Sequence, residues 1–369
     1  MGLKYLIVVV CLMWSTVVTA LTPAEIAEVK SATVFIGVYG ETDTPKQLGS
    51  GFFITPSGLL VTNYHVIHRA ETIRVWRYGE LTYYTGIIVG IDPLADLALI
   101  QITPPTSSAD EALKEIERHP FAFLEMEEEI DTIQPGTAVW AFGNPLSNRF
   151  VTTKGIITTD AMPGFLSPFV RQVIHDAVLN NGSSGGALLN AEGKVVGVNT
   201  YIMSPQGSYS GLGAATRSDT VTRSIRKMIK SNYIENEKPI VYPALDLHFL
   251  ELDDMGTNEA VQRAFPAQKI PNTFGILLRQ IEPESYPYEN GLREFDTIIS
   301  INGVPTNDRS QVADAIIDKE VGQEVYLTII RRGVIMLVPY MLTASTFNYV
   351  AYYDKDRGVP KGKPLQPDK

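Results

Sequence analysis

Short runs of β-branched and aromatic residues, separated by glycine, make up most of the sequence between residues 32 and 201. Many strands at short spacing are typical of an antiparallel barrel or sandwich. No regular alternation of strands with helices is present, which argues against a doubly wound parallel sheet. The sequence therefore predicts a mainly β fold, with strands expected at Thr33–Val38, Gly51–Ile54, Leu59–Thr62, Ile73–Arg77, Tyr83–Ile91, Leu97–Ile102, Ala138–Phe142, Val151–Thr158 and Val195–Thr200.

Three stretches of this first unit break the β pattern. Ser108–Arg118 has the composition of a capped helix, and Asp219–Lys230 predicts a helix that closes the unit. The acidic stretch Glu125–Glu129 is interpreted as a solvated surface insertion, with a regulatory or partner-binding loop as the alternative.

A second unit follows a change in composition. Residues 231–239 have the composition of a linker, and a unit of strands and one helix is expected over residues 240–343. The tail, residues 344–369, ends in proline, lysine and glycine and is expected to be disordered. In the second unit we expect strands at Gly275–Ile281, Phe295–Ile301 and Glu324–Ile330, a helix at Ser310–Asp318, and hairpin turns at Asn302-Gly303 and Arg332-Gly333.

Residues 1–20 combine a positive charge near the start, a long apolar run and the sequence Val18-Thr19-Ala20. This is the pattern of a secretory signal peptide, with an uncleaved membrane anchor as the alternative. The single cysteine, Cys11, lies inside this segment, and the bulky Val10 before it argues against lipid attachment. Residues 21–230 are therefore expected to form an exported domain that is stabilised by its core and not by disulfides.

The charge and the histidine spacing exclude two classes of function. A formal net charge of −10 argues against a nucleic-acid-binding surface. The five histidines lack the i, i+4 spacing that zinc sites use. The sequence therefore predicts no metal and no other cofactor.

The loop Asn180–Gly186, with the sequence NNGSSGG, carries the main chemical signal. Glycine permits a tight turn that presents a serine hydroxyl, and successive N–H groups in such a turn can point at one anion. A hydroxyl beside such donors is what acyl transfer needs, provided that a base lies nearby. Because a glycine–serine run alone is more often a flexible turn, its interpretation depends on residues elsewhere.

A base and an acid precede this loop in the chain. His65 is expected at the end of a strand, and His68 is the alternative base but is expected to be exposed. Asp96 abuts an apolar strand, where its carboxylate needs a hydrogen-bond partner, whereas Asp92 precedes a proline and is expected in a turn. The order His65, Asp96, Ser184 in an all-β chain is that of a chymotrypsin-type triad.

Six segments in this order resemble the HtrA (Deg) family of serine proteases: GSGFFI, TNYHVI, DPLADLALI, AFGNP, TTKGIIT and NNGSSGGALLN. Three later segments resemble the PDZ domain that follows the protease domain in that family: GILLRQIEPES, ENGLREFDTIISING and VGQEVYLTIIRRG. The resemblance implies a chymotrypsin-like double β-barrel over residues 21–230 and an α+β PDZ domain over residues 240–343.

The resemblance also implies the roles of the site residues. His65 is implied to be the general base, Asp96 its orienting partner and Ser184 the nucleophile, with the backbone N–H groups of Gly182 and Ser184 forming the oxyanion hole.

The loop departs from the family pattern N-P-G-N-S-G-G at two positions. Asn181 stands in place of the proline, so the loop is expected to be less constrained and to switch between formed and collapsed states. Ser183 stands in place of the second asparagine and is an alternative nucleophile, disfavoured because Ser184 directly precedes the Gly-Gly pair.

Specificity is also inferred from the resemblance. Val178 is implied near the base of the substrate pocket, with Leu212, Gly213 and Ala214 on the opposite wall. These positions carry no acidic side chain. We therefore expect the pocket to accept Val, Ala or Leu side chains of the substrate. In the second unit, Asp246 stands where the family tends to have a glycine in its carboxylate-binding loop, and an acid there would repel a peptide C-terminus. Packing of this unit against the protease is the alternative to peptide binding.

The sequence as a whole predicts an exported serine endopeptidase of HtrA type, periplasmic or otherwise extracytoplasmic, that cleaves unfolded or damaged proteins. The PDZ domain would recruit substrate or regulate activity, and the family implies a homo-trimer or higher oligomer. Two alternatives stay open: an inactive, chaperone-like binding protein, and a regulatory signalling protease anchored to the inner membrane by its N-terminal segment.

Overall fold

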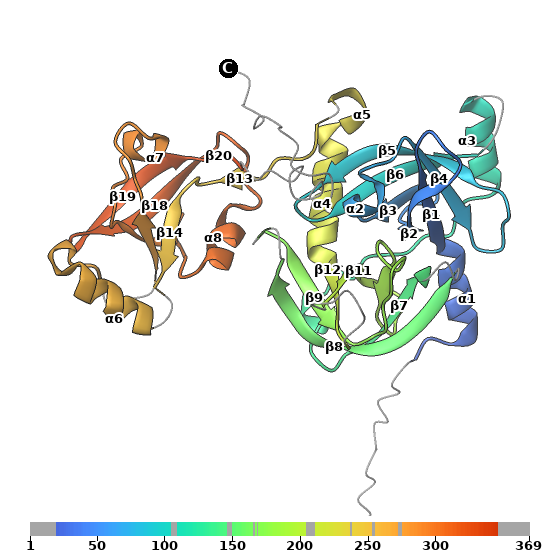
Figure 1. Cartoon of the computed structure of the whole chain (residues 1–369), viewed down its shortest axis with the longest axis horizontal. Coiled ribbons are helices and arrows are strands. Elements are labelled where there is room, and N and C mark those ends of the chain that lie inside the picture. Colours follow the sequence, from blue (N-terminus) through green and yellow to red (C-terminus); the bar gives the residue numbers. More distant parts are fainter. Residues whose placement is uncertain are drawn as a thin grey trace, which may run out of the picture.

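The computed structural model describes residues 20–345 apart from 105–108, 146–149, 165–166, 168, 204–210, 237, 253–254 and 272–274. The expected signal peptide or anchor and nearly all of the expected tail lie outside the described residues. Within these limits, no helix is both long enough and apolar enough to cross a membrane. The predicted mainly β fold with a double barrel is confirmed (Figure 1).

The first barrel closes six strands in the order β1-β2-β3-β6-β5-β4. Its interior is filled by β-branched, leucine and phenylalanine side chains, with at least one apolar residue from every strand, which is why the short apolar runs fold this way. A helix, α1 (Pro23–Ala32), precedes it and begins with a capping box between Thr22 and Glu25. The strands are β1 (Thr33–Tyr39), β2 (Pro45–Phe53), β3 (Leu59–Thr62), β4 (Thr72–Arg77), β5 (Tyr84–Asp92) and β6 (Leu97–Thr103).

The second barrel closes in the order β10-β11-β12-β9-β8-β7. The sequence analysis gave bounds for three of its strands and none for β9, β10 and β12, which are only three to five residues long. Helix α3 (Ala109–Arg118) lies in the connection between the barrels, at the expected position. The strands are β7 (Ala138–Gly143), β8 (Val151–Pro163), β9 (Arg171–His175), β10 (Ala187–Leu189), β11 (Val195–Ile202) and β12 (Gly213–Arg217).

Helix α4 (Ser218–Ser231) follows the second barrel and packs against the first (Figure 1). The approach to β5 is close, since a Cβ on Gly90 would lie 2.6 Å from Met228 Cβ. Side chains of both barrels and of α4 share one core, which fixes the two barrels against each other. Its members include Phe52, Val61, Leu99, Trp140, Phe142, Leu189, Val198, Val221 and Met228.

The second unit lies beside α4 and is built on a sheet in the order β14-β15-β16-β18-β19, with β17 (Val304–Pro305) paired to β16 (Figure 1). A two-stranded sheet of β13 (Pro243–Ala244) and β20 (Thr343–Ala344) leads into it. Its other elements are β14 (His248–Glu251), α6 (Met255–Ala264), β15 (Ile276–Arg279), α7 (Tyr286–Glu289), β16 (Thr297–Ile301), α8 (Arg309–Ile316), β18 (Glu324–Arg331) and β19 (Val334–Met341).

Two local features differ from an irregular linker and a wholly solvated acidic stretch. Part of the expected linker is helical, because α5 (Tyr233–Asn236) follows α4 after a left-handed residue at Asn232. The acidic stretch is not wholly solvated, because the Glu127 side chain is 6% exposed and accepts a hydrogen bond from Asn190 Nδ2 at 2.8 Å. Backbone bonds from this stretch to Val195 also anchor it to the second barrel.

Candidate active site

The residues at the end of β3 place a histidine against a carboxylate. His65 lies in the short helix α2 (Tyr64–Ile67), directly after β3, and not in the strand itself. Its Nδ1 lies 2.6 Å from Asp96 Oδ2, and its backbone N–H donates to Asp96 Oδ1 at 2.8 Å. The carboxylate therefore fixes both the imidazole and the start of the helix.

Asp96 occupies a strained turn between β5 and β6. Its φ is +53°, a left-handed conformation that a non-glycine residue seldom adopts. The conformation is held by two donors to its carbonyl, Asn63 Nδ2 at 2.7 Å and the Tyr64 N–H at 3.2 Å. The surrounding contacts thus direct the carboxylate towards α2.

The electrostatics favour a charged imidazole. Burial lowers the pKa of His65, but the negative charge of Asp96 and the hydrogen bond to it outweigh that effect, so the pKa is raised above 6.5. The side chain is still 27% exposed, so the ring can reach a substrate.

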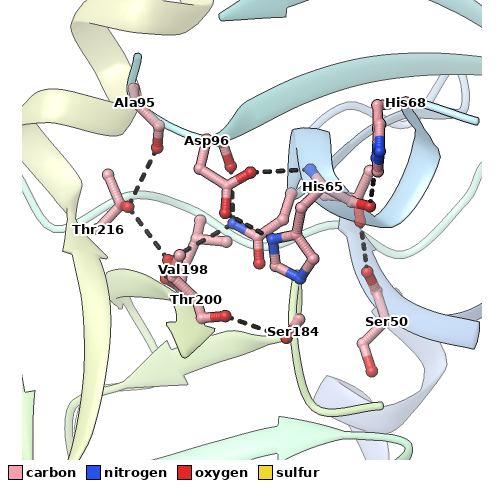
Figure 2. Close-up of polar contacts among 11 residues, drawn as sticks. Ser50, His65, His68, Ala95, Asp96, Ser184, Val198, Thr200 and Thr216 are labelled. Atoms are coloured by element: carbon pink, nitrogen blue, oxygen red, sulfur yellow. Dashed lines mark hydrogen bonds and ion pairs between the residues drawn. The ribbon is translucent and has the colours of Figure 1, made fainter. Parts of the chain in front are cut away.

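The two serines of the glycine-rich loop have different surroundings. The Ser184 hydroxyl donates to the Thr200 carbonyl at 3.0 Å, and Figure 2 shows the His65 ring with one nitrogen towards Asp96 and the other towards Ser184. Ser183 is 4% exposed, and its Oγ accepts a hydrogen bond from the Asn180 N–H at 3.3 Å. Ser184 thus faces the histidine, whereas Ser183 is buried and bonded within the loop.

The backbone of the loop is held open at Gly182. Its φ is +100°, and a Cβ there would lie 2.4 Å from the Asn144 carbonyl oxygen, so only glycine fits. Within the described part of the chain, the N–H groups of Gly182 and Ser184 donate to no protein acceptor. Two unused donors one residue apart are suited to binding an oxyanion.

The sequence analysis missed Ser50, which connects this loop to the first barrel. Its Oγ donates to the Gly182 carbonyl at 2.7 Å and accepts a hydrogen bond from the Asn144 N–H at 2.9 Å. Its own N–H donates to the Ser184 carbonyl at 2.9 Å. The only signal in the sequence was a serine between two glycines, Gly49 and Gly51.

The expected pocket residues lie at one end of the paired strands β9 and β12. Gly213 pairs with His175, so Leu212 precedes the pairing while Val178 follows it. Val178 and Leu212 are 44% and 37% exposed, whereas Ala214 is fully buried. The segment 204–210 before Leu212 is outside the described residues.

His68, the alternative base, has a different environment. Its Nδ1 lies 2.9 Å from the His65 carbonyl, and its ring packs against Tyr64.

Among the residues that the structure describes, no group of three or more His, Cys, Asp and Glu side chains could hold a metal ion.

A family model described as a trypsin-like peptidase domain matches residues 49–198. A probable periplasmic serine endoprotease DegP-like from Rickettsia prowazekii is 30% identical over 311 residues, which are 82% of this chain and 54% of the relative. Residues 49–198 therefore match a trypsin-like peptidase domain, and the chain is similar to DegP-type serine endoproteases over most of its length. Other similar proteins are the periplasmic serine endoprotease DegP of Escherichia coli K12, 30% identical, and the serine protease HTRA1 of Xenopus tropicalis, 31% identical.

These two matches cover 82% and 79% of this chain and 58% of each relative, so the chain spans little more than half the length of the curated relatives. Among solved structures, the HtrA-type protease AlgW with tripeptide matches with a TM-score of 0.72 at 22% identity, covering 87% of this chain and 96% of that one. The serine endoprotease from Yersinia pestis matches with a TM-score of 0.64 at 22% identity, covering 87% and 97%. At this identity, the likeness shows that the fold is shared.

Proposed function

We propose that the chain is a serine endopeptidase that uses Ser184 as nucleophile, His65 as general base and Asp96 as the group that orients the base. The contact of 2.6 Å between His65 Nδ1 and Asp96 Oδ2, beside Ser184, is the observation that carries this proposal. The names of the relatives support the same activity.

The geometry supports acyl transfer in two steps. The Ser184 hydroxyl first exchanges its bond to the Thr200 carbonyl for one to His65 Nε2, which takes the proton as Oγ attacks the peptide carbonyl. The N–H groups of Gly182 and Ser184 bind the oxyanion that forms. His65 then protonates the leaving amine, and water hydrolyses the acyl-enzyme with His65 as base again.

The proposed substrates are unfolded or damaged proteins, cleaved after small to medium apolar residues. Val178, Leu212, Gly213 and Ala214 would line the pocket, and their lack of charge supports this preference.

The proposed organisation is a protease domain over residues 21–230, a linker over 231–239 and a PDZ domain over 240–343 that recruits substrate or regulates the site. The left-handed φ of +51° at Asp246 is a conformation that suits the glycine of the family's loop. Its charge favours a regulatory or packing role over tight binding of a peptide carboxylate.

The proposed location is extracytoplasmic, with an N-terminal signal peptide or anchor and a homo-oligomeric state of three or more copies. Relatives named as periplasmic endoproteases support export. Sequencing of the mature N-terminus would distinguish a cleaved signal peptide from an uncleaved anchor, and analytical ultracentrifugation would give the number of copies in the oligomer.

Casein digestion with mass mapping of the cleavage sites tests activity, nucleophile and pocket together. We expect Ser184→Ala to abolish cleavage and labelling by a fluorophosphonate, and the matched variant Ser183→Ala to keep both. Cleavage that persists in Ser184→Ala would contradict the proposed nucleophile, and cleavage mainly after Lys or Arg would contradict the proposed pocket. A wild type without either activity would favour the inactive, chaperone-like alternative.

A further inference from the structure

A second buried carboxylate lies four residues before Asp96, in the same turn. Asp92 is fully buried at the end of β5, where the sequence suggested only a turn residue. Its Oδ2 accepts hydrogen bonds from Ser224 Oγ at 2.5 Å and Tyr242 Oη at 2.6 Å, and its Oδ1 accepts one from the Ala95 N–H at 3.1 Å. Burial raises the pKa of Asp92, and these donors oppose the rise.

The bond from the Ala95 N–H to Asp92 Oδ1 holds Ala95, the residue directly before Asp96. The Ala95 carbonyl is held from the other side by Thr216 Oγ1 at 3.3 Å. The peptide units on both sides of Ala95 are therefore tied down, which helps to keep Asp96 at its unfavourable φ of +53°. A shift of the Asp92 carboxylate would release this turn and change the aim of Asp96 at His65.

Tyr242 lies in the segment that leads from the barrels and α4 into the second unit. Its side chain is 1% exposed, and its ring is stacked on Phe169 at a centroid distance of 5.2 Å and lies 5.0 Å from Lys227 Nζ. Its carbonyl accepts a hydrogen bond from the Ser345 N–H at 2.9 Å, next to the β13–β20 pair. The position of the Tyr242 hydroxyl against Asp92 thus depends on how the second unit is docked.

Removal of the Tyr242 hydroxyl would take one hydrogen-bond donor from the Asp92 carboxylate. A buried carboxylate that loses a donor must move to a new partner or remain unsatisfied, and either change is costly at a fully enclosed site. Lys227 acts on Asp92 through its charge and Arg223 acts on Tyr242 in the same way, but neither replaces a donor in contact with Asp92 Oδ2.

We propose that Tyr242 is a positioning residue that, through Asp92, holds the turn of Asp96 and so couples the docking of the second unit to the orientation of His65. This inference rests on the proposed function, since it concerns the same triad. Tyr242 does not touch the reacting atoms; it acts through the turn.

The test compares Tyr242→Phe with Tyr340→Phe. Tyr340 is the matched control because its buried hydroxyl donates to the Leu245 carbonyl at 2.6 Å, within the second unit and away from Asp92. In Tyr242→Phe we expect labelling of Ser184 by a fluorophosphonate to slow by about tenfold, with the acid limb of its pH profile shifted to lower pH. Tyr340→Phe should keep the wild-type rate and profile, and Ser224→Ala should change both in the same direction as Tyr242→Phe.

The titration of His65, followed by NMR with isotope-labelled histidine, separates this inference from the proposed function. We expect a lower His65 pKa in Tyr242→Phe than in wild type, since Asp96 then stabilises the imidazolium less. An unchanged His65 pKa in Tyr242→Phe would overturn the inference, even if the wild type is an active protease. A wild type that is never labelled at Ser184 would overturn the proposed function, while the His65 titration would still decide the role of Tyr242.

Discussion

At the residue scale, the raised pKa of His65 is expected to set the lower pH limit of the proposed activity. A base must be neutral to accept the Ser184 proton, so kcat/KM is expected to fall as pH drops through a value above 6.5. Asp96→Asn removes the charge that raises the pKa and the acceptor that orients the ring. The rate should fall by on the order of 10³- to 10⁴-fold, with the residual acid limb shifted to lower pH. A pH profile of Asp96→Asn with an unshifted acid limb would contradict this account.

The pKa of His175 is shifted in the opposite direction to that of His65, and this shift affects the stability of the fold. Its side chain is fully buried, and burial lowers its pKa from 6.5 to about 4. The unfolded chain then binds more protons than the native one between these values. The free energy of unfolding is therefore not reduced by His175 above pH 6.5. As the pH falls from 6.5 towards 4, it decreases by up to about 3 kcal/mol.

The free energy of unfolding against pH tests this prediction. His175→Leu should flatten the slope between these two values, whereas His119→Gln should not, since the His119 side chain is 75% exposed. An unchanged slope in His175→Leu would assign the pH dependence to another group.

At the element scale, the loop between β9 and β10 depends on glycine for its shape. In Gly182→Ala, the new Cβ would clash with the Asn144 carbonyl at 2.4 Å, in addition to the strain of φ +100°. Gly136→Ala is the matched control, with φ +92° and nothing within 4 Å of the new Cβ. We expect Gly182→Ala to lose 100-fold or more in kcat, on the order of one oxyanion donor, and Gly136→Ala to lose only about 1 kcal/mol of stability. Equal kcat losses in both variants would show that strain, and not the clash, is responsible.

Much of the element pattern could be predicted from the sequence, because it is local. The alternating runs matched the strands of the first barrel, and the turns Asn302-Gly303 and Arg332-Gly333 have the left-handed φ values expected of tight hairpins. Short strands such as β10 carry too few residues to show a period. The contacts of Ser50 with Gly182 and of Asp92 with Tyr242 span 132 and 150 residues, and no local pattern encodes such pairs.

At the scale of the whole molecule, the second unit meets the two-barrel unit and helix α4 through opposite charges. Arg171 Nη2 lies 2.6 Å from Asp314 Oδ2, Arg223 Nε lies 3.5 Å from Asp318 Oδ1, and Lys230 pairs with Glu320. The acidic partners are 60–80% exposed, so these pairs are weak and are screened by salt. Docking of the second unit is therefore expected to weaken as salt rises.

Hydrogen exchange of the segment around Ile240 and Tyr242 measures this docking, because the Ile240 N–H donates to the Ile91 carbonyl at 3.2 Å. Raising the salt from about 0.05 to 0.5 M should speed exchange there, with a smaller effect in the barrel strands. Arg171→Asp alone should act in the same direction, and Arg171→Asp combined with Asp314→Arg should restore protection, since the pair is then reversed. Reversal of the exposed pair Lys46–Glu71 within the first barrel should leave the segment unchanged. Exchange at this segment that responds neither to salt nor to Arg171→Asp would mean that its apolar contacts alone hold the second unit in place.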